Sequence, residues 1–332
     1  MREELKAGNR SLFSQSLQNA LAHTLQANLQ AILFLNRRGS ATYVFCRNCG
    51  YVVRCPRCEL PLAHHADTGM LLCHTCGYQR QPLTSCPQCN HQQIREYGAG
   101  TEKVEQLVKQ QFPNARVLRW DADTVRVHGA EDILLSHFIN HRADILIGTQ
   151  MLAKGLDLPY VTLVGVVLAD VGLNFPDYRA GERTFQILAQ VAGRAGRSLL
   201  GGRVILQTFQ PFHYAIQRAA EHDFEGFYKQ ELEYRAHLGY PPFNELIRLE
   251  TADLAWGKAK ERAEAMAAEI LDRLIEQNRK DVDVIGPAPA FFSRVSSKYR
   301  WQVILRGQNL RDVLGRQKLA EWKVDVNPPD LL

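Results

Sequence analysis

No cysteine occurs outside the segment Cys46–Cys89, and no long hydrophobic run is present in the 332 residues. The longest apolar stretch, Val161–Ala169, is far shorter than the roughly 20 residues that a membrane-spanning helix needs. The first residues, MREELKAGNR, lack the apolar core of a secretory signal. We therefore expect neither a membrane span nor secretion, and predict a cytoplasmic protein with no membrane partner.

The sequence also lacks a strong excess of charge. Charged residues make up 23% and hydrophobic residues 45%, which is typical of a folded globular protein, and the length suits two or three domains. The formal net charge is +5, but eight thiolates holding two divalent ions would reduce it to about +1. Overall charge therefore does not indicate a nucleic-acid partner; only local basic clusters could do so.

All eight cysteines form four CxxC pairs, which are Cys46/Cys49, Cys55/Cys58, Cys73/Cys76 and Cys86/Cys89. A CxxC turn directs two sulfurs at one point, and a closed tetrahedral zinc site needs two such turns. We therefore predict two structural zinc ions per chain. A disulfide framework would need an oxidising compartment, and an iron–sulfur cluster favours less regular spacing, so zinc is preferred to both.

Four CxxC pairs can be joined into two sites in three ways. The fourteen residues between Cys58 and Cys73 suit a hairpin that brings the two inner pairs together. We predict an inner site from Cys55, Cys58, Cys73 and Cys76, and an outer site from Cys46, Cys49, Cys86 and Cys89. Because eight thiolates already fill two sites, we expect the neighbouring histidines at the surface; they are His64, His65, His74 and His91.

Strands and helices alternate on both sides of the cysteine segment. Leucines at four-residue spacing predict an amphipathic helix over 11–30, and AILFLN predicts a buried strand over 31–36. A helix over 101–112 has Thr101 as its expected N-cap. The remaining predicted strands are 115–120, 143–149, 161–167 and 203–209, with helices at 131–140 and near 184–192. This alternation predicts a doubly wound parallel sheet.

The pattern changes after Phe209. Residues 212–238 are predicted to be mostly helical, and GYPPF breaks the chain at 239–243. Strands at 245–252, 282–288 and 299–307, with a long helix at 256–278 and a final helix, predict a small α+β domain. We expect four segments: the start of the α/β domain at 1–45, a zinc-binding insertion at 46–90, the rest of the α/β domain at 91–238, and the C-terminal α+β domain at 239–332.

Two motifs follow predicted strands. GTQMLAKGLDLPYV begins at Gly148, at the carboxyl end of a strand, where the ligands of open α/β sheets bind. QVAGRAGR places Arg194 and Arg197 three residues apart on one face of a helix end, and two guanidinium groups can bind a triphosphate. An exposed basic helix end is the alternative for the second motif alone, but the two motifs in this order favour a nucleotide site.

ILIGTQMLAKGLDLP resembles motif V of superfamily 2 helicases, and QVAGRAGR resembles motif VI; both belong to the second RecA-like lobe. Together with FLNRRG, the CxxC pairs and GTEKVE, nearly the whole chain resembles the bacterial replication-restart helicases of the PriA (primosomal protein N′) family. The resemblance implies an ATP-dependent 3′-to-5′ DNA helicase that uses Mg²⁺ and assembles the primosome at stalled forks. It implies as partners branched and single-stranded DNA, primosome proteins, the single-stranded-DNA-binding protein and the loader of the replicative helicase.

The resemblance also assigns residues to the nucleotide site. It implies γ-phosphate contacts for Arg194 and Arg197, and a catalytic position for Gln190. Asp157 would contact the ribose, and the remaining nucleotide-binding positions are Gly148, Thr149, Gln150, Gly155 and Gly193. In the C-terminal domain it implies a DNA contact through charge and stacking, by Arg294, Lys298, Tyr299, Arg300 and Trp301. A solvated strand face with Trp301 packed inside is the alternative.

The sequence has no P-loop, GxxxxGK followed by Ser or Thr, and no DE pair for magnesium. Two interpretations follow. In the first, the chain is the C-terminal part of an ATP-dependent helicase without its P-loop lobe. In the second, it is a stand-alone zinc-dependent module that binds DNA or primosome proteins without ATPase activity. We favour the first, and expect the chain alone to be catalytically incomplete.

Overall fold

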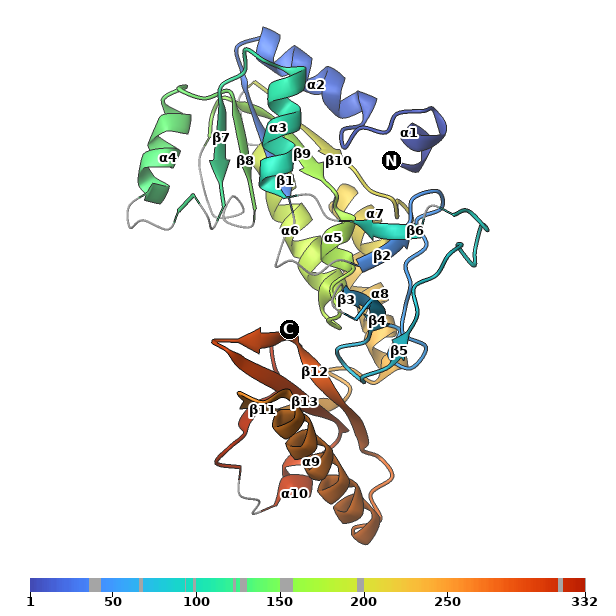
Figure 1. The fold of residues 1–332 in the computed structure, drawn as a ribbon. Helices are drawn as coiled ribbons and strands as arrows, with labels where there is room; N and C mark the ends of the chain where they lie inside the picture. Colours follow the sequence, from blue (N-terminus) through green and yellow to red (C-terminus); the bar gives the residue numbers. More distant parts are fainter. Residues whose placement is uncertain are drawn as a thin grey trace. The chain divides into compact units, whose positions relative to one another are not determined.

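The computed structural model describes residues 1–35, 43–65, 68–92, 94–97, 100–121, 124–125, 130–149, 158–195, 200–315 and 319–331, with the backbone alone at 95–97, 194 and 195. The chain divides into two compact units (Figure 1). Unit 1 comprises Met1–Tyr51, Ser85–Leu173 and Gly181–Phe227. Unit 2 comprises Val52–Thr84, Asn174–Ala180 and Tyr228–Leu332.

Unit 1 is built on a parallel sheet with the strand order β10-β9-β1-β8-β7. Its strands are β1 (Gln30–Leu35), β7 (Val117–Trp120), β8 (Ile145–Gly148), β9 (Val161–Val167) and β10 (Arg203–Leu206). Every residue of β1 and β8 is buried, because central strands of a parallel sheet are covered by helices on both faces. The predicted parallel sheet is confirmed.

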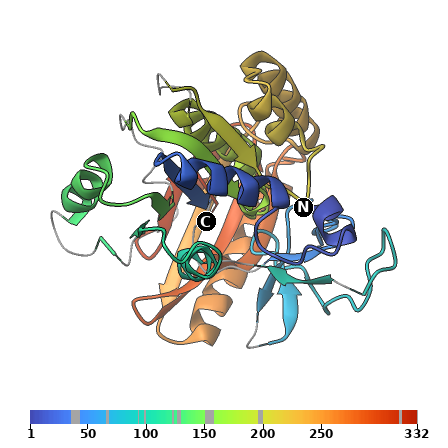
Figure 2. The same ribbon diagram turned by 90° about the horizontal axis from the view of Figure 1, so that it is seen from above.

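Helices cover both faces of this sheet (Figure 2). On one face lie α2 (Gln15–Gln26) and α3 (Thr101–Gln111), and Leu17 of α2 packs so closely that a Cβ at Gly165 would lie 2.7 Å from it. On the other face, Phe34 and Val164 share a core with Phe138, Phe185 and Ile216. Those three residues belong to α4 (Ala130–Ile139), α6 (Ala180–Ala195) and α7 (Tyr214–Ala220).

Shorter elements complete unit 1. They are α1 (Arg2–Lys6), α5 (Asp170–Leu173), and the antiparallel pair of β2 (Tyr43–Cys46) with β6 (Ile94–Tyr97). Helix α8 (Phe224–Leu238) begins in unit 1 and continues into unit 2. No helix in the described part of the chain is long and apolar enough to cross a membrane.

Unit 2 contains an antiparallel sheet with the order β12-β13-β11-β14. The strands are β11 (Glu245–Asp253), β12 (Asp283–Val295), β13 (Lys298–Gly307) and β14 (Lys323–Val326), and the helices packed on them are α9 (Trp256–Glu276) and α10 (Leu310–Leu314). The cysteine-rich part of unit 2 adds a small antiparallel set, β3 (Ala63–His65), β4 (Met70–Leu72) and β5 (Gln79–Arg80).

The start of α3 differs from expectation. Thr101 is the first helical residue and Gly100 is the N-cap, so Thr101 does not cap the helix. Its hydroxyl instead donates to Asp121 at 2.6 Å. The Asp121 carboxylate, 20 residues along the chain, therefore takes the Thr101 hydroxyl. Capping rules, which consider only residues of the first helical turn, do not include such a partner.

Candidate metal centres and the carboxyl edge of the parallel sheet

The four CxxC turns share one backbone conformation. In each turn, the residue after the second cysteine donates its N–H to the carbonyl of the first cysteine at 2.8–2.9 Å. That closing residue has a positive φ between 55° and 80°; the four closing residues are Gly50, Glu59, Gly77 and Asn90. The common geometry directs the two sulfurs of each turn toward one point, as a tetrahedral metal site requires.

The structure brings the cysteines together in the two groups of the nested prediction. In the outer site (Cys46, Cys49, Cys86, Cys89) and in the inner site (Cys55, Cys58, Cys73, Cys76), the four Sγ atoms lie within 4.8 Å of one another. Neighbouring Sγ atoms are 3.5–3.6 Å apart. Four thiolates at about 2.3 Å from one zinc would be about 3.8 Å apart, whereas a disulfide needs about 2.05 Å. Both sites fit a zinc ion.

Crowding of thiols also favours a cation at the outer site. Burial raises the pKa of Cys46, and burial with the neighbouring thiols raises the pKa of Cys49 to about 12, whereas hydrogen bonds from Asn48 and the His91 backbone lower the pKa of Cys89 to about 6. Four adjacent sulfurs cannot all become thiolates without a positive ion among them, because each negative charge opposes the next. A zinc ion would remove this conflict by coordinating all four as thiolates.

The outer site packs on the carboxyl edge of the parallel sheet. A Cβ at Gly50 would lie 2.5 Å from the carbonyl oxygen of Phe209, in the loop after β10, and the rings of Phe45 and Phe209 meet edge to face at 4.9 Å. Arg2 donates from Nη1 to the carbonyl of Cys49 at 2.9 Å. Glycine at position 50 therefore serves both the left-handed turn and this close backbone contact.

Asp170 holds the loop on which the outer site packs. Its buried carboxylate accepts from the Thr208 hydroxyl at 2.7 Å, the Phe209 N–H at 2.8 Å and the Gln210 N–H at 2.9 Å. Burial raises the pKa of Asp170, and these donors counteract the rise. The carboxylate thus joins the ends of β9 and β10, two neighbouring strands whose loops meet at one edge of the sheet.

The inner site packs on the C-terminal sheet, within unit 2. A Cβ at Gly77 would lie 2.9 Å from the carbonyl oxygen of Pro287 in β12. His74, between two of the cysteines, is 3% exposed, and its Nδ1 lies 3.2 Å from the carbonyl oxygen of Pro289. Gln302 of β13 donates from Nε2 to the carbonyl of His74 at 2.9 Å.

The surface position expected for His74 is therefore wrong, because the turn that carries it is covered by β12 and β13. Since a carbonyl only accepts, Nδ1 of His74 carries a proton, and burial lowers the pKa of His74 to about 4, so the ring is neutral at pH 7. Its Nε2 is then an acceptor for Nε2–H of His65 at 3.0 Å. Here the histidine serves packing rather than metal binding.

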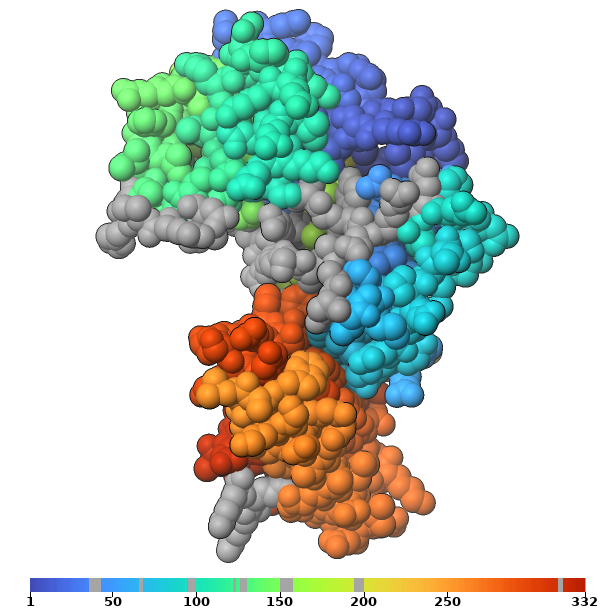
Figure 3. All heavy atoms as spheres, in the orientation of Figure 1, coloured from blue at the N-terminus to red at the C-terminus, as the bar shows by residue number. Residues whose placement is uncertain are grey.

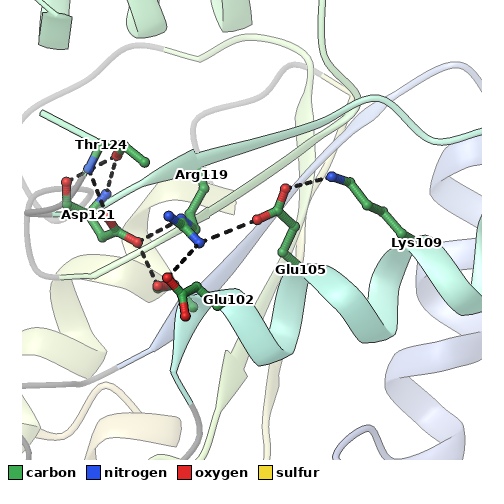
Figure 4. A network of polar contacts seen from close by, with 7 residues as sticks. Glu102, Glu105, Lys109, Arg119, Asp121 and Thr124 are labelled. Carbon is green, nitrogen blue, oxygen red and sulfur yellow. Dashed lines mark hydrogen bonds and ion pairs between the residues drawn. The ribbon is translucent and has the colours of Figure 1, made fainter.

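A network of ion pairs lies at the end of β7 (Figure 4). Asp121 accepts from the Thr101 hydroxyl and pairs with Nε of Arg119 at 2.9 Å. Arg119 also lies 3.5 Å from Glu102 and from Glu105 of α3. The network fixes the first turn of α3 to the carboxyl end of β7. Trp120, the last residue of β7, pairs with Gly148 at the end of β8.

The structure describes only some residues of the two predicted nucleotide motifs. Gly148 is the last residue of β8, and half-buried Thr149 follows it at the carboxyl edge. Helix α6 buries Phe185, Leu188 and Val191 against the sheet, and an exposed face bears Gln186, Gln190 and Gly193. Gln150, Gly155, Asp157, Arg197 and the side chain of Arg194 lie outside the described residues, so their assignments remain predictions.

Comparison with known protein families covers both units. The helicase conserved C-terminal domain matches residues 89–198. The PriA DNA helicase Cys-rich region domain matches residues 55–81, and the primosomal protein N C-terminal domain matches residues 236–329. The replication restart protein PriA of Synechocystis sp. is 45% identical over 92% of this chain, and that of Bacillus subtilis is 44% identical over 99% of it.

The chain belongs to the PriA family. It spans 37% of the Synechocystis relative and 42% of the Bacillus relative, so it corresponds to less than half the length of these proteins. The PriA cysteine-rich region and the two four-cysteine clusters together support zinc binding. The match to the helicase conserved C-terminal domain includes strands β7, β8 and β9 of the parallel sheet.

The basic and aromatic run of the PriA C-terminal domain proves mixed in character. Trp301 is buried in the core beneath α9, and Arg300 pairs with Glu250 of β11. Arg294 lies over the ring of Tyr299, with its Cζ 5.2 Å from the ring centroid. Within this run, Arg294 and Lys298 are exposed, whereas Tyr299 is half-buried and packs against the same core as Trp301.

Sequence reasoning missed Asp170, Phe209 and His74. No motif in the sequence points to Asp170, which follows the apolar run of β9, and nothing local distinguishes Phe209 from other strand-end aromatics. One signal was available for His74: it lies inside a CxxC pair, in CHTC. Such a residue is held close to whatever the turn packs against.

Proposed function

We propose that this chain provides the second ATPase lobe and the C-terminal domain of an ATP-dependent 3′-to-5′ DNA helicase that restarts replication at stalled forks. ATP and Mg²⁺ would bind between this lobe and a lobe that carries the missing P-loop. Arg194, Arg197 and Gln190 would face the nucleotide. DNA, primosome proteins, the single-stranded-DNA-binding protein and the helicase loader are the proposed partners, and the cytoplasm is the proposed location.

The observation that carries this proposal is the exposed face of α6. Gln190 and Gly193 lie on it, and a Cβ at Gly193 would meet no atom of the described residues within 4 Å. In the sequence, Arg197 comes four residues after Gly193, and its contact with the γ-phosphate is what the resemblance implies. An exposed polar face with no side chain at Gly193 suits contact with the phosphates held by a second lobe.

The metal would have a structural role in this enzyme. Both sites hold four cysteines and leave no open position for substrate, which distinguishes a structural zinc site from a catalytic one. The eight cysteines would hold two zinc ions per chain, and each ion would fix two CxxC turns. The chemistry that zinc supplies here is the neutralisation and cross-linking of thiolates.

ATP hydrolysis in the presence of single-stranded DNA tests whether this chain needs a second lobe with a P-loop. The chain alone should show no turnover. A chimera in which the chain replaces the matching region of the Bacillus subtilis relative should hydrolyse ATP and unwind a 3′-tailed duplex. DNA-stimulated turnover by the isolated chain would contradict the proposal, as would a folded, zinc-loaded chimera that binds DNA without hydrolysing ATP.

A further inference from the structure

The two metal sites are built alike, with one packed turn and one solvent-facing turn each. In the packed turns, residues 46–50 and 73–77, most residues are buried or half-buried, whereas exposed residues predominate in the turns at 55–59 and 86–90. In the space-filling view the segment around residues 80–92 (cyan), which carries the turn at 86–90, lies at the surface (Figure 3). The sequence repeats this division, because the packed turns close with glycine and the exposed turns close with Glu59 and Asn90.

Backbone conformation alone does not explain this difference. All four closing residues have a positive φ, and Glu59 and Asn90 adopt it with side chains. What separates Gly50 and Gly77 is a carbonyl oxygen of another segment, 2.5 Å and 2.9 Å from the position of a Cβ. Since real Cβ atoms do not approach so closely, these two glycines mark the points where each metal site is joined to its surroundings.

The two junctions belong to different units. Gly50 meets Phe209, whose N–H is held by Asp170 at the carboxyl edge of the parallel sheet. Gly77 meets Pro287 in β12, and His74 and Gln302 add hydrogen bonds at the same place. All residues of the first junction lie in unit 1 and all those of the second lie in unit 2.

The second junction replaces a missing strand neighbour. β12 is an edge strand, and its pairing with β13 is interrupted between Ile285 and Ala288 and again after Pro289. Prolines are tolerated at such edges because they donate no ladder hydrogen bond. The carbonyls of Pro287 and Pro289 lie against the turn of the inner site, so that turn covers an irregular edge of the C-terminal sheet.

We propose that the two metal sites are separate joints: the metal of the outer site holds the loop after β10, and the metal of the inner site holds the edge strand β12. Loss of one metal therefore loosens one unit and leaves the other intact. This inference depends on zinc occupancy and not on ATP hydrolysis. A failure of the helicase proposal would leave it unaffected.

Two matched ligand variants of the full chain test the proposal. Cys58→Ser and Cys89→Ser each remove one ligand from an exposed turn, so neither substitution touches a junction directly. Each should lower the zinc content by about one ion per chain. Amide hydrogen exchange measured by mass spectrometry should then accelerate at Ala288, Ala290 and Phe291 only in Cys58→Ser, and at Phe209 and Gln210 only in Cys89→Ser.

Glycine variants keep all eight ligands and guard against general misfolding. Gly77→Ala should accelerate exchange at Ala288 and Ala290 and speed zinc transfer from the inner site to a chelator. Gly69→Ala is its control, because Gly69 also has a positive φ, 66°, but a Cβ there would meet no atom of the described residues within 4 Å. This control should leave exchange at Ala288 and Ala290 unchanged. Loosening of both units by either cysteine variant, of neither unit, or equally by Gly77→Ala and Gly69→Ala, would overturn the proposal.

Discussion

At the scale of single residues, a positive φ requires glycine in one turn of the inner site but not in the other. Glu59 and Gly77 close equivalent turns of the inner site with φ of 56° and 74°. A Cβ at Gly77 would lie 2.9 Å from the carbonyl oxygen of Pro287, whereas Glu59 is exposed and carries its side chain at the same kind of backbone angle. The sequence predicted the metal ligands from spacing, but it could not show which turn is packed, because packing depends on segments more than 150 residues away in the chain.

Asp170 provides a residue-scale prediction. Asp170→Ala should leave the buried Phe209 N–H and the Thr208 hydroxyl without this acceptor, and the Gln210 N–H with only the Thr208 Oγ1 as its acceptor. We expect a loss of roughly 2–4 kcal/mol in the free energy of opening of β9 and β10. Native-state amide exchange measures this quantity.

Asp170→Asn is the matched control for that experiment. Its amide oxygen can still accept from part of the donor set, so it should cost clearly less than alanine. Equal losses for the two variants, or an alanine variant with wild-type protection, would show that the hydrogen bonds of Asp170 do not hold the two strand ends together.

At the scale of elements, the long periodic segments were predictable and the short ones were not. The apolar runs gave β1, β8 and β9, since a strand buried on both faces has no polar alternation. Strand β14 was missed, because KVDV is short and half polar and is stabilised by its pairing with β11. The parallel sheet of the candidate site followed from sequence, whereas the loop held by Asp170 did not.

The pairing of β11 with β14 gives an element-scale prediction. Asp325 of β14 accepts from Nη2 of buried Arg248 of β11 at 2.7 Å. Burial raises the pKa of Asp325, but the hydrogen bonds from Arg248 and Lys323 lower it by more, so the net shift of the pKa is downward. The ion pair therefore stabilises the fold above the ordinary aspartate pKa of about 3.9, and this stabilisation is lost as the pH falls through the lowered pKa.

Asp325→Asn should accordingly destabilise the C-terminal sheet by about 1–2 kcal/mol at pH 7. The difference from the wild type should shrink below about pH 4. Urea unfolding at a series of pH values measures both effects, and exposed Asp272→Asn is the control. A difference that stays constant down to pH 3 would contradict the ion-pair explanation.

At the scale of the whole molecule, the chain combines two units that each contain a four-cysteine site. The CxxC spacing predicted both sites, but it suggested one continuous zinc-binding segment at 46–90. In the structure the outer site belongs to unit 1 and the inner site to unit 2. The nested order of the pairs permits this arrangement, because both inner pairs lie in one continuous segment, Val52–Thr84, between the two outer pairs.

Removal of metal gives the first prediction at this scale. Elemental analysis should find about two zinc ions per chain, and a strong chelator should release both. The far-ultraviolet circular dichroism should then decrease only slightly, because the parallel sheet and the C-terminal sheet have hydrophobic cores of their own. One zinc ion or none in the untreated protein would refute the two-site assignment.

The most direct test of the central claim is the DNA-stimulated ATPase rate of the Bacillus chimera with Arg197→Ala. An arginine that contacts the γ-phosphate contributes roughly 10³- to 10⁵-fold to the rate, so the variant should lose nearly all turnover while it retains zinc and binds DNA. Arg203→Ala, at the exposed start of β10, is the control and should retain the parent rate. Turnover by Arg197→Ala at the rate of this control would contradict the assignment of the chain as the second lobe of a nucleotide-driven helicase.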